Sequence, residues 1–212
     1  MVTLQQIKPL EIEAESFRII EREFAGQTGC LMTDYSMEEF AIVRRVIHAT
    51  GDFGFAANLR FHSQAIAAGL AAIRAGKNVL TDVNMAAAGI SRSFLEKFGG
   101  QVICRVGEAE VAARASLLGL TRSETALALA GSDNVGIVAI GNAPTALLAV
   151  MELIAVGKIR PDLVVGVPVG FVNAAESKEL LAQKEYPFIT TLGRKGGSPV
   201  AVAIVNALLR LA

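Results

Sequence analysis

The sequence has few of the residues that build metal sites and disulfides: its 212 residues include two cysteines, two histidines and no tryptophan. Cys30 and Cys104 stand far apart, outside any CxxC or Cys/His cluster, so we expect two small buried thiols, a reducing compartment and no protein-bound metal. Neither sign of charge is in excess, because 20 basic side chains balance 20 acidic ones. Nucleic acid is therefore not an expected partner, since its backbone selects proteins with a basic surplus.

Uninterrupted apolar runs long enough for a membrane span are also lacking. The most apolar stretch, residues 135–157, has the right length but is broken by Asn142 and Pro144 and carries Glu152, so it predicts a buried strand, a turn and a helix. The amino-terminal segment lacks the basic and apolar regions of a secretory signal. We expect a cytoplasmic protein without a membrane partner.

Hydrophobic residues make up 52% of the chain, enough for a sizeable core, and we expect one domain over residues 1–212. Helices are predicted over 9–25, over 36–48 and from Ser63 to Gly76. Strands are predicted at 78–82, 101–106, 134–140, 162–167 and 187–192, and further helices start near Ser91, Glu108, Thr121, Pro144, Asn173 and Ser198. Continuously apolar strands that alternate with helices predict a three-layer α/β/α sandwich around a mainly parallel, doubly wound sheet of about five strands.

Several helix starts carry capping residues. Ser36-x-x-Glu39 and Thr121-x-x-Glu124 match the capping box, in which side chains satisfy the first free amides of a helix. Asn173 resembles such a cap, and Ser198 precedes a proline in the first turn. These four positions fix where we expect the helices to begin.

Ligands of doubly wound sheets bind beyond the carboxyl ends of the strands, here segments 81–89, 141–145, 168–177 and 193–198. The segment GRKGGS (193–198) predicts either an anion site built from amides, a helix dipole and Lys195, or a basic turn. GNAPT (141–145) predicts either part of the ligand site or, as its spacing favours, only a helix start. The sequence contains neither GxGxxG after a strand nor a P-loop motif.

Two histidines limit the candidate acids. His48, in the last turn of a predicted helix, either caps that helix with Asp52 holding its ring, or acts as a general acid. His62 precedes a helix start and is interpreted as structural. One turn before His48, Arg44 and Arg45 are candidates to bind a carboxylated ligand.

The last predicted helix, SPVAVAIVNALLRLA, is apolar on nearly all sides. Such a helix must be covered all round, so we expect a partner subunit to cover the side that the sheet does not. This predicts a homodimer with the ligand site near the interface.

Four long segments resemble the precorrin-8 methylmutases of cobalamin biosynthesis, including those acting on the cobalt form. They are RRVIHATGDFGFA (44–56), GNAPTALL (141–148), GVPVGFVNAAESKELL (166–181) and TLGRKGGSPVAVAIVNALL (191–209). Shorter matches at 13–20, 80–90 and 120–127 extend the resemblance over nearly the whole chain.

The resemblance implies an isomerase that moves a methyl group from C11 to C12 of the tetrapyrrole, giving hydrogenobyrinate or cobyrinate. It also implies a flavodoxin-like fold, a homodimer, no cofactor for this redox-neutral reaction, and His48 as the catalytic residue. Protonation of a ring nitrogen by His48 favours a 1,5-sigmatropic shift. The implied substrate-binding residues are Ser16, Arg45, Thr81, Arg122, Asn142, Thr145, Asn173 and Lys195, with Arg45, Arg122 and Lys195 facing the substrate carboxylates.

Two rival hypotheses remain at this stage. A non-catalytic tetrapyrrole carrier would use the same cleft, with His48 only orienting the ligand. A phosphate- or nucleotide-binding α/β enzyme is suggested by GRKGGS alone.

Overall fold

The computed structural model describes residues 7–131 and 133–212, so the expectation about an amino-terminal signal falls partly outside the described residues. Six strands form one sheet in the order β1-β6-β5-β4-β2-β3. They are β1 (Leu59–Phe61), β2 (Asn78–Thr81), β3 (Val102–Ile103), β4 (Val135–Ile140), β5 (Leu163–Gly166) and β6 (Phe188–Thr191).

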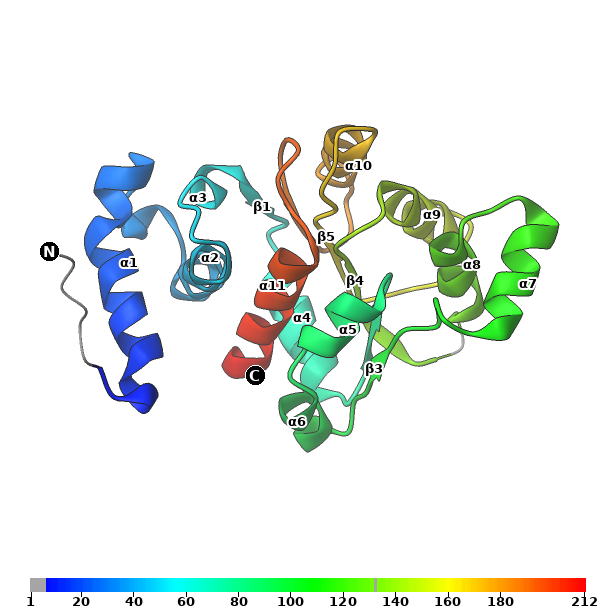
Figure 1. Ribbon diagram of the computed structural model, residues 1–212, viewed down its shortest axis with the longest axis horizontal. Coiled ribbons are helices and arrows are strands. Elements are labelled where there is room, and N and C mark those ends of the chain that lie inside the picture. Colours follow the sequence, from blue (N-terminus) through cyan, green and yellow to red (C-terminus); the bar gives the residue numbers. More distant parts are fainter. Residues whose placement is uncertain (1–6, 132) are drawn as a thin grey trace, which may run out of the picture.

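The helices surround this sheet (Figure 1). They are α1 (Ile12–Thr28), α2 (Met37–Thr50), α3 (Phe55–Asn58), α4 (Ala65–Arg74), α5 (Asn84–Gly89), α6 (Arg92–Leu95), α7 (Ala109–Leu118), α8 (Arg122–Leu129), α9 (Pro144–Ala155), α10 (Ala174–Leu181) and α11 (Ser198–Leu211). Short 3-10 turns lie at Pro9–Glu11, Met32–Asp34 and Glu96–Phe98.

The expected α/β class is confirmed, and the five predicted strands pair in parallel. The expectation of about five strands missed β1, which pairs antiparallel with β6 at the edge and places Leu59 opposite Thr191. Three residues are too few to show an apolar pattern, which explains the miss. The short helices α3 and α5 were not predicted either, and α5 occupies part of the segment interpreted as a loop.

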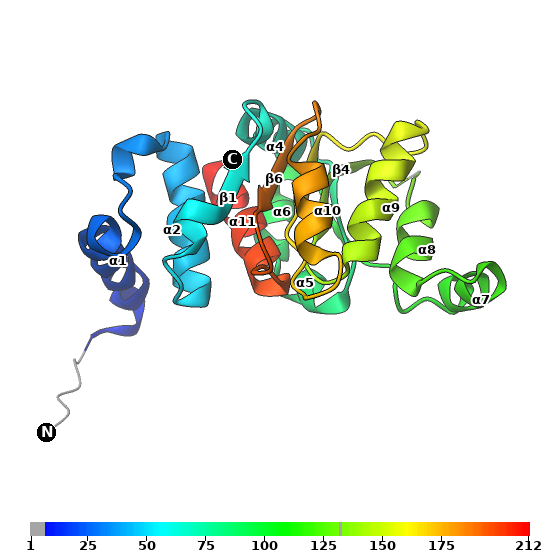
Figure 2. The same cartoon turned by 90° about the horizontal axis from the view of Figure 1, so that it is seen from above.

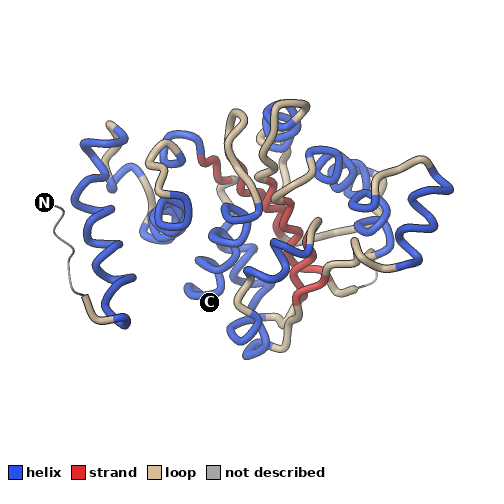
Figure 3. Tube along the Cα trace, viewed as in Figure 1, coloured by secondary structure: helices blue, strands red, loops and turns tan. Residues whose placement is uncertain are grey.

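Both faces of the sheet are buried, which is why its strands are continuously apolar. In β4, Ile137 and Ala139 point into one hydrophobic cluster, and Val138 and Ile140 point into a second. Helices α4 and α11 cover the first face, while α8, α9 and α10 cover the second (Figures 1 and 3). The sheet is thus the middle layer of the expected sandwich.

The reason given for a partner subunit was wrong, because the chain covers α11 itself. Helix α2 packs along α11, with α4 and α5 beside it, and Val200, Ile204 and Leu208 are at most 1% exposed. Helix α1 then packs on α2 through Ile20 and Phe24. Figure 2 shows α1 and α2 as additional layers outside the sandwich.

Two of the four predicted helix caps are confirmed. The Ser36 amide donates to Glu39 at 2.8 Å, and the Ser36 hydroxyl accepts the Glu39 amide at 3.1 Å. Thr121 and Glu124 make the same reciprocal pair. Asn173 occupies the cap position in a left-handed conformation, with φ 59°, and its side chain makes no cap bond.

The cap predicted at Ser198 was also wrong. Ser198 is already the first helical residue of α11, and the preceding Gly197, with φ 120°, takes the cap position. A side-chain oxygen is therefore not available to the first amides of this helix, whose entry is set by the glycine backbone instead.

The apolar stretch 135–157 folds as predicted into β4, a turn and α9. Across residues 7–131 and 133–212, none of the helices combines the length and apolar character needed to cross a bilayer. Cys30 and Cys104 are both free thiols, half-buried and not fully buried as expected.

Candidate functional site

Most of the predicted site residues gather at the carboxyl edge of the sheet. Asn142 follows β4, Asn173 follows the β5 segment, and Lys195 follows β6. Thr145 lies in the first turn of α9, and Arg122 begins α8, whose next residue donates its hydroxyl to the Asp82 carbonyl at 3.3 Å. This is the edge at which ligands of doubly wound sheets bind.

Thr81 is the exception at this edge, because its hydroxyl is already engaged. It is the last residue of β2 and is 1% exposed. The hydroxyl lies 3.3 Å from the carbonyl oxygen of Val83 and 3.4 Å from that of Ile103. Thr81 therefore forms part of the wall below the edge.

His48 and Ser16 line one shallow cavity of about 230 Å³ between α1 and α2. Its other walls are Ile19, Ile20, Ile47, Gly51 and Phe53. The imidazole stands edge-on to the Phe17 ring, with centroids 5.3 Å apart and planes at 89°. Gly51, with φ 66°, ends α2 three residues after His48, so the ring lies in the last helical turn as predicted.

The charges around His48 act in opposite directions. Its pKa is held below the ordinary value first by burial and then by the positive charge of Arg45, while Glu13 opposes both. Arg45 lies one turn before His48 on α2 and pairs with Glu13 of α1 at 2.6 Å. Its guanidinium also stacks 4.8 Å from the Phe17 centroid. Ser16, Arg45 and His48 thus form one group at the contact of α1 with α2.

The expectation that Asp52 holds the His48 ring was wrong, because the Asp52 carboxylate binds other groups. The Asp52 carboxylate accepts hydrogen bonds from Lys195 Nζ at 2.6 Å and from the Gly54 amide at 2.8 Å. The Lys195 contact is also what chiefly lowers the Asp52 pKa. This ion pair joins the segment after His48 to the loop after β6, so it links the two groups of predicted residues.

Asp82 fixes the loop after β4 and was missed by sequence reasoning. Its fully buried carboxylate accepts the backbone amides of Gly141, Asn142 and Ala143 at 3.1, 2.9 and 2.9 Å. Burial raises the Asp82 pKa, and these three bonds oppose the rise. The amides of the three residues just before α9 are therefore occupied by an internal anion.

Lys178 supports the loop after β6 and was missed as well. It lies in α10 with 0% exposure, and its ammonium donates to the carbonyl oxygen of Lys195 at 2.6 Å. Asp82 and Lys178 both lie in segments that resemble the methylmutase family, but a single charged residue does not by itself indicate burial. Lys178 stands between Ser177 and Glu179, so its neighbours in the sequence do not indicate burial either.

Several large apolar side chains beside these loops are exposed to solvent. Val169, Phe171 and Val172, which follow β5, are 47%, 83% and 76% exposed, and Met85 at the start of α5 is 71% exposed. Arg194 stacks on Phe171, 5.3 Å from the ring centroid. Large exposed apolar side chains beside cationic ones suit an anionic ligand with a flat apolar body.

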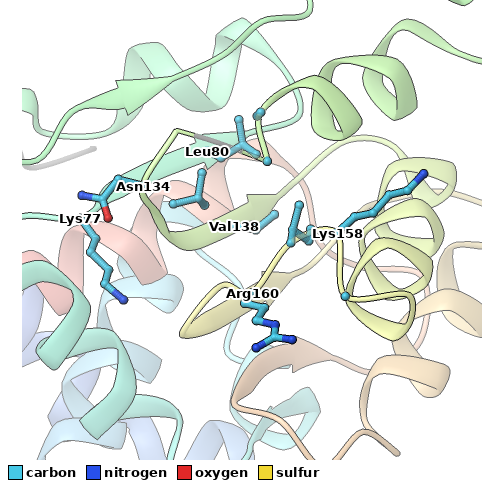
Figure 4. A pocket seen from close by; sticks show the side chains of 11 residues that line it. Lys77, Leu80, Asn134, Val138, Lys158 and Arg160 are labelled. Atoms are coloured by element: carbon cyan, nitrogen blue, oxygen red, sulfur yellow. The ribbon is translucent and has the colours of Figure 1, made fainter.

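A cavity of about 370 Å³ lies at the opposite edge, at the amino ends of β2, β4 and β5. In Figure 4 the side chains of Lys158 and Arg160 point in different directions. The Lys77 ammonium there is paired with Asp162 at 2.8 Å. Because its cations do not converge and it contains none of the predicted residues, we place the site at the carboxyl edge.

His62 has the structural role expected of it. Its Nδ1 accepts the Gln64 amide at 3.2 Å, and its ring packs 5.7 Å from that of Phe188. Within the described ranges, no three His, Cys, Asp or Glu side chains are grouped to hold a metal ion.

The sequence and fold match known proteins over nearly the full length. The profile of the precorrin-8X methylmutase family (CbiC) matches residues 11–211. A cobalt-precorrin-8 methylmutase of Priestia megaterium is 44% identical over 208 residues, which cover 97% of this chain and 89% of that protein. A precorrin-8X methylmutase of Pseudomonas aeruginosa is 47% identical, with 81% and 83% covered. The crystal structure of a precorrin-8X methylmutase from Thermus thermophilus superposes with a TM-score of 0.85 at 46% identity, covering 95% of each chain. The chain therefore belongs to the precorrin-8X methylmutase family.

Proposed function

We propose that this protein moves a methyl group from C11 to C12 of precorrin-8 or cobalt-precorrin-8, giving hydrogenobyrinate or cobyrinate, in cobalamin biosynthesis. The observation that carries the proposal is the position of His48. His48 lines a surface cavity next to Asp52, whose carboxylate binds the Lys195 ammonium. The chain that carries this cavity matches the methylmutase family over nearly its full length.

His48 acts as a general acid in the proposed mechanism. Its imidazolium donates a proton or a strong hydrogen bond to a ring nitrogen of the tetrapyrrole, which withdraws electron density from the π system and favours the 1,5-sigmatropic shift. The proton returns to His48 after migration, so the isomerisation is balanced without another reactant. A positioned acid contributes a rate factor of about 10² to 10⁴.

Because the pKa of His48 is lowered in the free protein, the substrate itself would help to protonate His48. In the free protein, burial and Arg45 disfavour the imidazolium. The substrate is edged with acetate and propionate groups, and a carboxylate bound near Arg45 would offset that positive charge. Binding then raises the His48 pKa and loads the acid only when the reacting ring is present.

The other predicted residues bind the rim of the macrocycle. Lys195 and Arg122 on the loops, together with Arg45, hold carboxylates, while Ser16, Asn142, Thr145 and Asn173 make polar contacts. Thr81 serves as wall, because its hydroxyl is engaged within the chain. Phe171 and its apolar neighbours pack against the flat face of the ring.

The working form we propose is a cytoplasmic homodimer in which residues 1–212 act as one domain. The cavity at His48 measures about 230 Å³ in one chain. Pockets that enclose small molecules span about 300–1,000 Å³, so a macrocycle needs further walls. A second copy that packs beside the cavity supplies them. Light scattering during size-exclusion chromatography tests this, with twice the chain mass expected and a monomer contradicting it.

The test of the activity is incubation of the purified protein with the metal-free and with the cobalt-containing substrate. We expect the visible absorption to change to that of a corrin while the mass of the tetrapyrrole stays constant, as an isomerisation requires. Tight binding with the methyl group left at C11 would identify a carrier and contradict the proposal. Absence of binding by either form, with nucleotide binding instead, would do the same.

A further inference from the structure

Lys178 is a buried cation without a carboxylate partner among the described residues. Its side chain is 0% exposed, and burial alone lowers its pKa to about 8. The ammonium donates to the Lys195 carbonyl oxygen at 2.6 Å and to Thr191 Oγ1 at 3.3 Å. Burying an ammonium against neutral acceptors is unfavourable, so an apolar residue of this length would give the simpler core. The lysine therefore calls for a specific explanation.

The carbonyl that Lys178 holds belongs to a tightly placed loop, residues 192–197. The Gly197 amide donates to the Val167 carbonyl at 2.8 Å, and the Gly170 amide donates to that of Arg194 at 3.3 Å. A side chain at Gly196 would collide with the carbonyl oxygen of Val167, so only glycine fits there. The loop after β6 is thereby pressed against the loop after β5.

Lys195 connects this support to the site. Its carbonyl oxygen is bound from inside the protein by Lys178 and, at 3.0 Å, by the Thr191 hydroxyl. Its side chain, which is 56% exposed, runs outward, and its ammonium meets Asp52, four residues after His48. The three motifs that carry Lys178, Lys195 and His48 are thus joined by consecutive contacts.

We propose that Lys178 is a positioning residue for the methylmutase reaction: by holding the Lys195 carbonyl from within, it aims the Lys195 ammonium at a substrate carboxylate beside His48. The proposal rests on the proposed function. Lys178 does not itself touch the substrate, because its side chain is buried. Its charge strengthens the hydrogen bond to the carbonyl, and this explains why a cation is retained in the core.

The first test is Lys178→Met, which keeps the length of the side chain and removes its charge. Replacing a buried charge by an apolar group often leaves folding intact. We expect KM to rise about tenfold, because a tenfold change corresponds to the free energy of roughly one charge-assisted hydrogen bond. We expect kcat to change less than about twofold. Lys184→Met, an exposed lysine just after the same helix, is the control and leaves both constants unchanged.

A double-mutant cycle with Lys195→Met separates positioning from a general structural effect. If Lys178 acts through Lys195, Lys178→Met adds less than about twofold to KM in a protein that already carries Lys195→Met. Equal effects of Lys178→Met in both backgrounds, or an unchanged KM in the folded single variant, would overturn the proposal. If Lys178→Met does not fold, Thr191→Val carries the test, with a smaller rise in KM expected and an unchanged KM contradicting it.

Hydrogen exchange read by mass spectrometry tests the loop without reference to turnover. In Lys178→Met we expect faster exchange of the amides of residues 192–198, with β4 and α9 unchanged. Faster exchange in a protein whose wild type does not isomerise the tetrapyrrole would retain the loop support and refute the proposed function. Unchanged exchange in an active enzyme would refute the role of Lys178 alone.

Discussion

Two loops at the same edge of the sheet are each held by one buried charge, but the charges have opposite signs. The loop after β4 is held by Asp82, which accepts three backbone amides. The loop after β6 is held by Lys178, which donates to one carbonyl. The first arrangement uses the amides of the three residues just before α9, so these amides are not available to an external anion. The second uses an inward carbonyl and leaves the Lys195 ammonium facing outward.

This difference decides a question that the motifs left open. GRKGGS predicted either an anion site or a basic turn, and GNAPT predicted either part of a ligand site or only a helix start. Because Asp82 already binds the amides of Gly141, Asn142 and Ala143, the turn of GNAPT is held from within the protein and does not offer these amides to a ligand. GRKGGS keeps its cation at the surface, so we assign carboxylate binding to the loop after β6.

The largest expected effect comes from breaking the anionic anchor. Asp82→Asn places amide hydrogens against backbone donors in a fully buried position, so we expect a loss of about 3 kcal/mol in the free energy of unfolding. Urea denaturation measures it. The control Glu179→Gln changes an exposed acid and should stay within about 0.5 kcal/mol. A loss for Asp82→Asn no larger than the control's would show that the carboxylate does not anchor the loop.

The cationic anchor predicts a dependence of stability on alkaline pH. The Lys178 pKa is about 8 in the folded protein and 10.5 in the ordinary lysine, so between these values the unfolded chain binds the additional proton. Stability contributed by this group therefore rises with pH across that window, by about 2 kcal/mol.

Denaturant titrations of wild type and Lys178→Met at pH 7 and pH 10.5 isolate that contribution. We expect the variant to gain less stability, or lose more, than the wild type over this interval. Parallel curves for the two proteins would mean that Lys178 titrates normally and is not buried as described.

A smaller effect is expected for the ion pair between Lys195 and Asp52. Their side chains are 56% and 33% exposed, and solvent screens such pairs. Lys195→Met should therefore change the free energy of unfolding by less than about 1 kcal/mol while weakening substrate binding. A stability loss as large as that of Asp82→Asn would show that Lys195 is part of the scaffold and not of the ligand site.

The smallest effect concerns the pKa of His48, which proton NMR can follow because the chain has two histidines. We expect a pKa below the ordinary value, lowered further by Glu13→Gln and raised by Arg45→Met. Arg114→Met, on the distant helix α7, should leave it unchanged. A reversed order of the first two variants would contradict the charge balance described at the site.

The sequence predicted the long strands and helices of this structure better than its short elements and its contacts between distant segments. Five parallel strands followed from apolar runs bounded by marked helix starts, whereas β1 is too short for such a pattern. The helix α11 was correctly predicted as covered on all sides, but the cover is α2, and contacts between distant segments cannot be read from periodicity.

Site residues on loops were predictable because loop position follows from strand order. Asn142, Asn173 and Lys195 lie at the carboxyl edge for that reason. Asp82 and Lys178 were missed because burial of a lone charge depends on the tertiary environment. The bond from Lys195 to Asp52 was missed for the same reason, and the competing pair of His48 with Asp52, four residues apart, was expected in its place.

A single turnover of bound substrate by His48→Asn, compared with His62→Asn, tests directly whether His48 is the acid. Asparagine keeps a hydrogen-bond donor of similar reach but cannot transfer a proton. We expect the His48 variant to bind substrate and its rate of methyl migration to fall by about 10²-fold or more, while the His62 variant reacts like wild type. Methyl migration at the wild-type rate in the His48 variant would show that this histidine is not the acid.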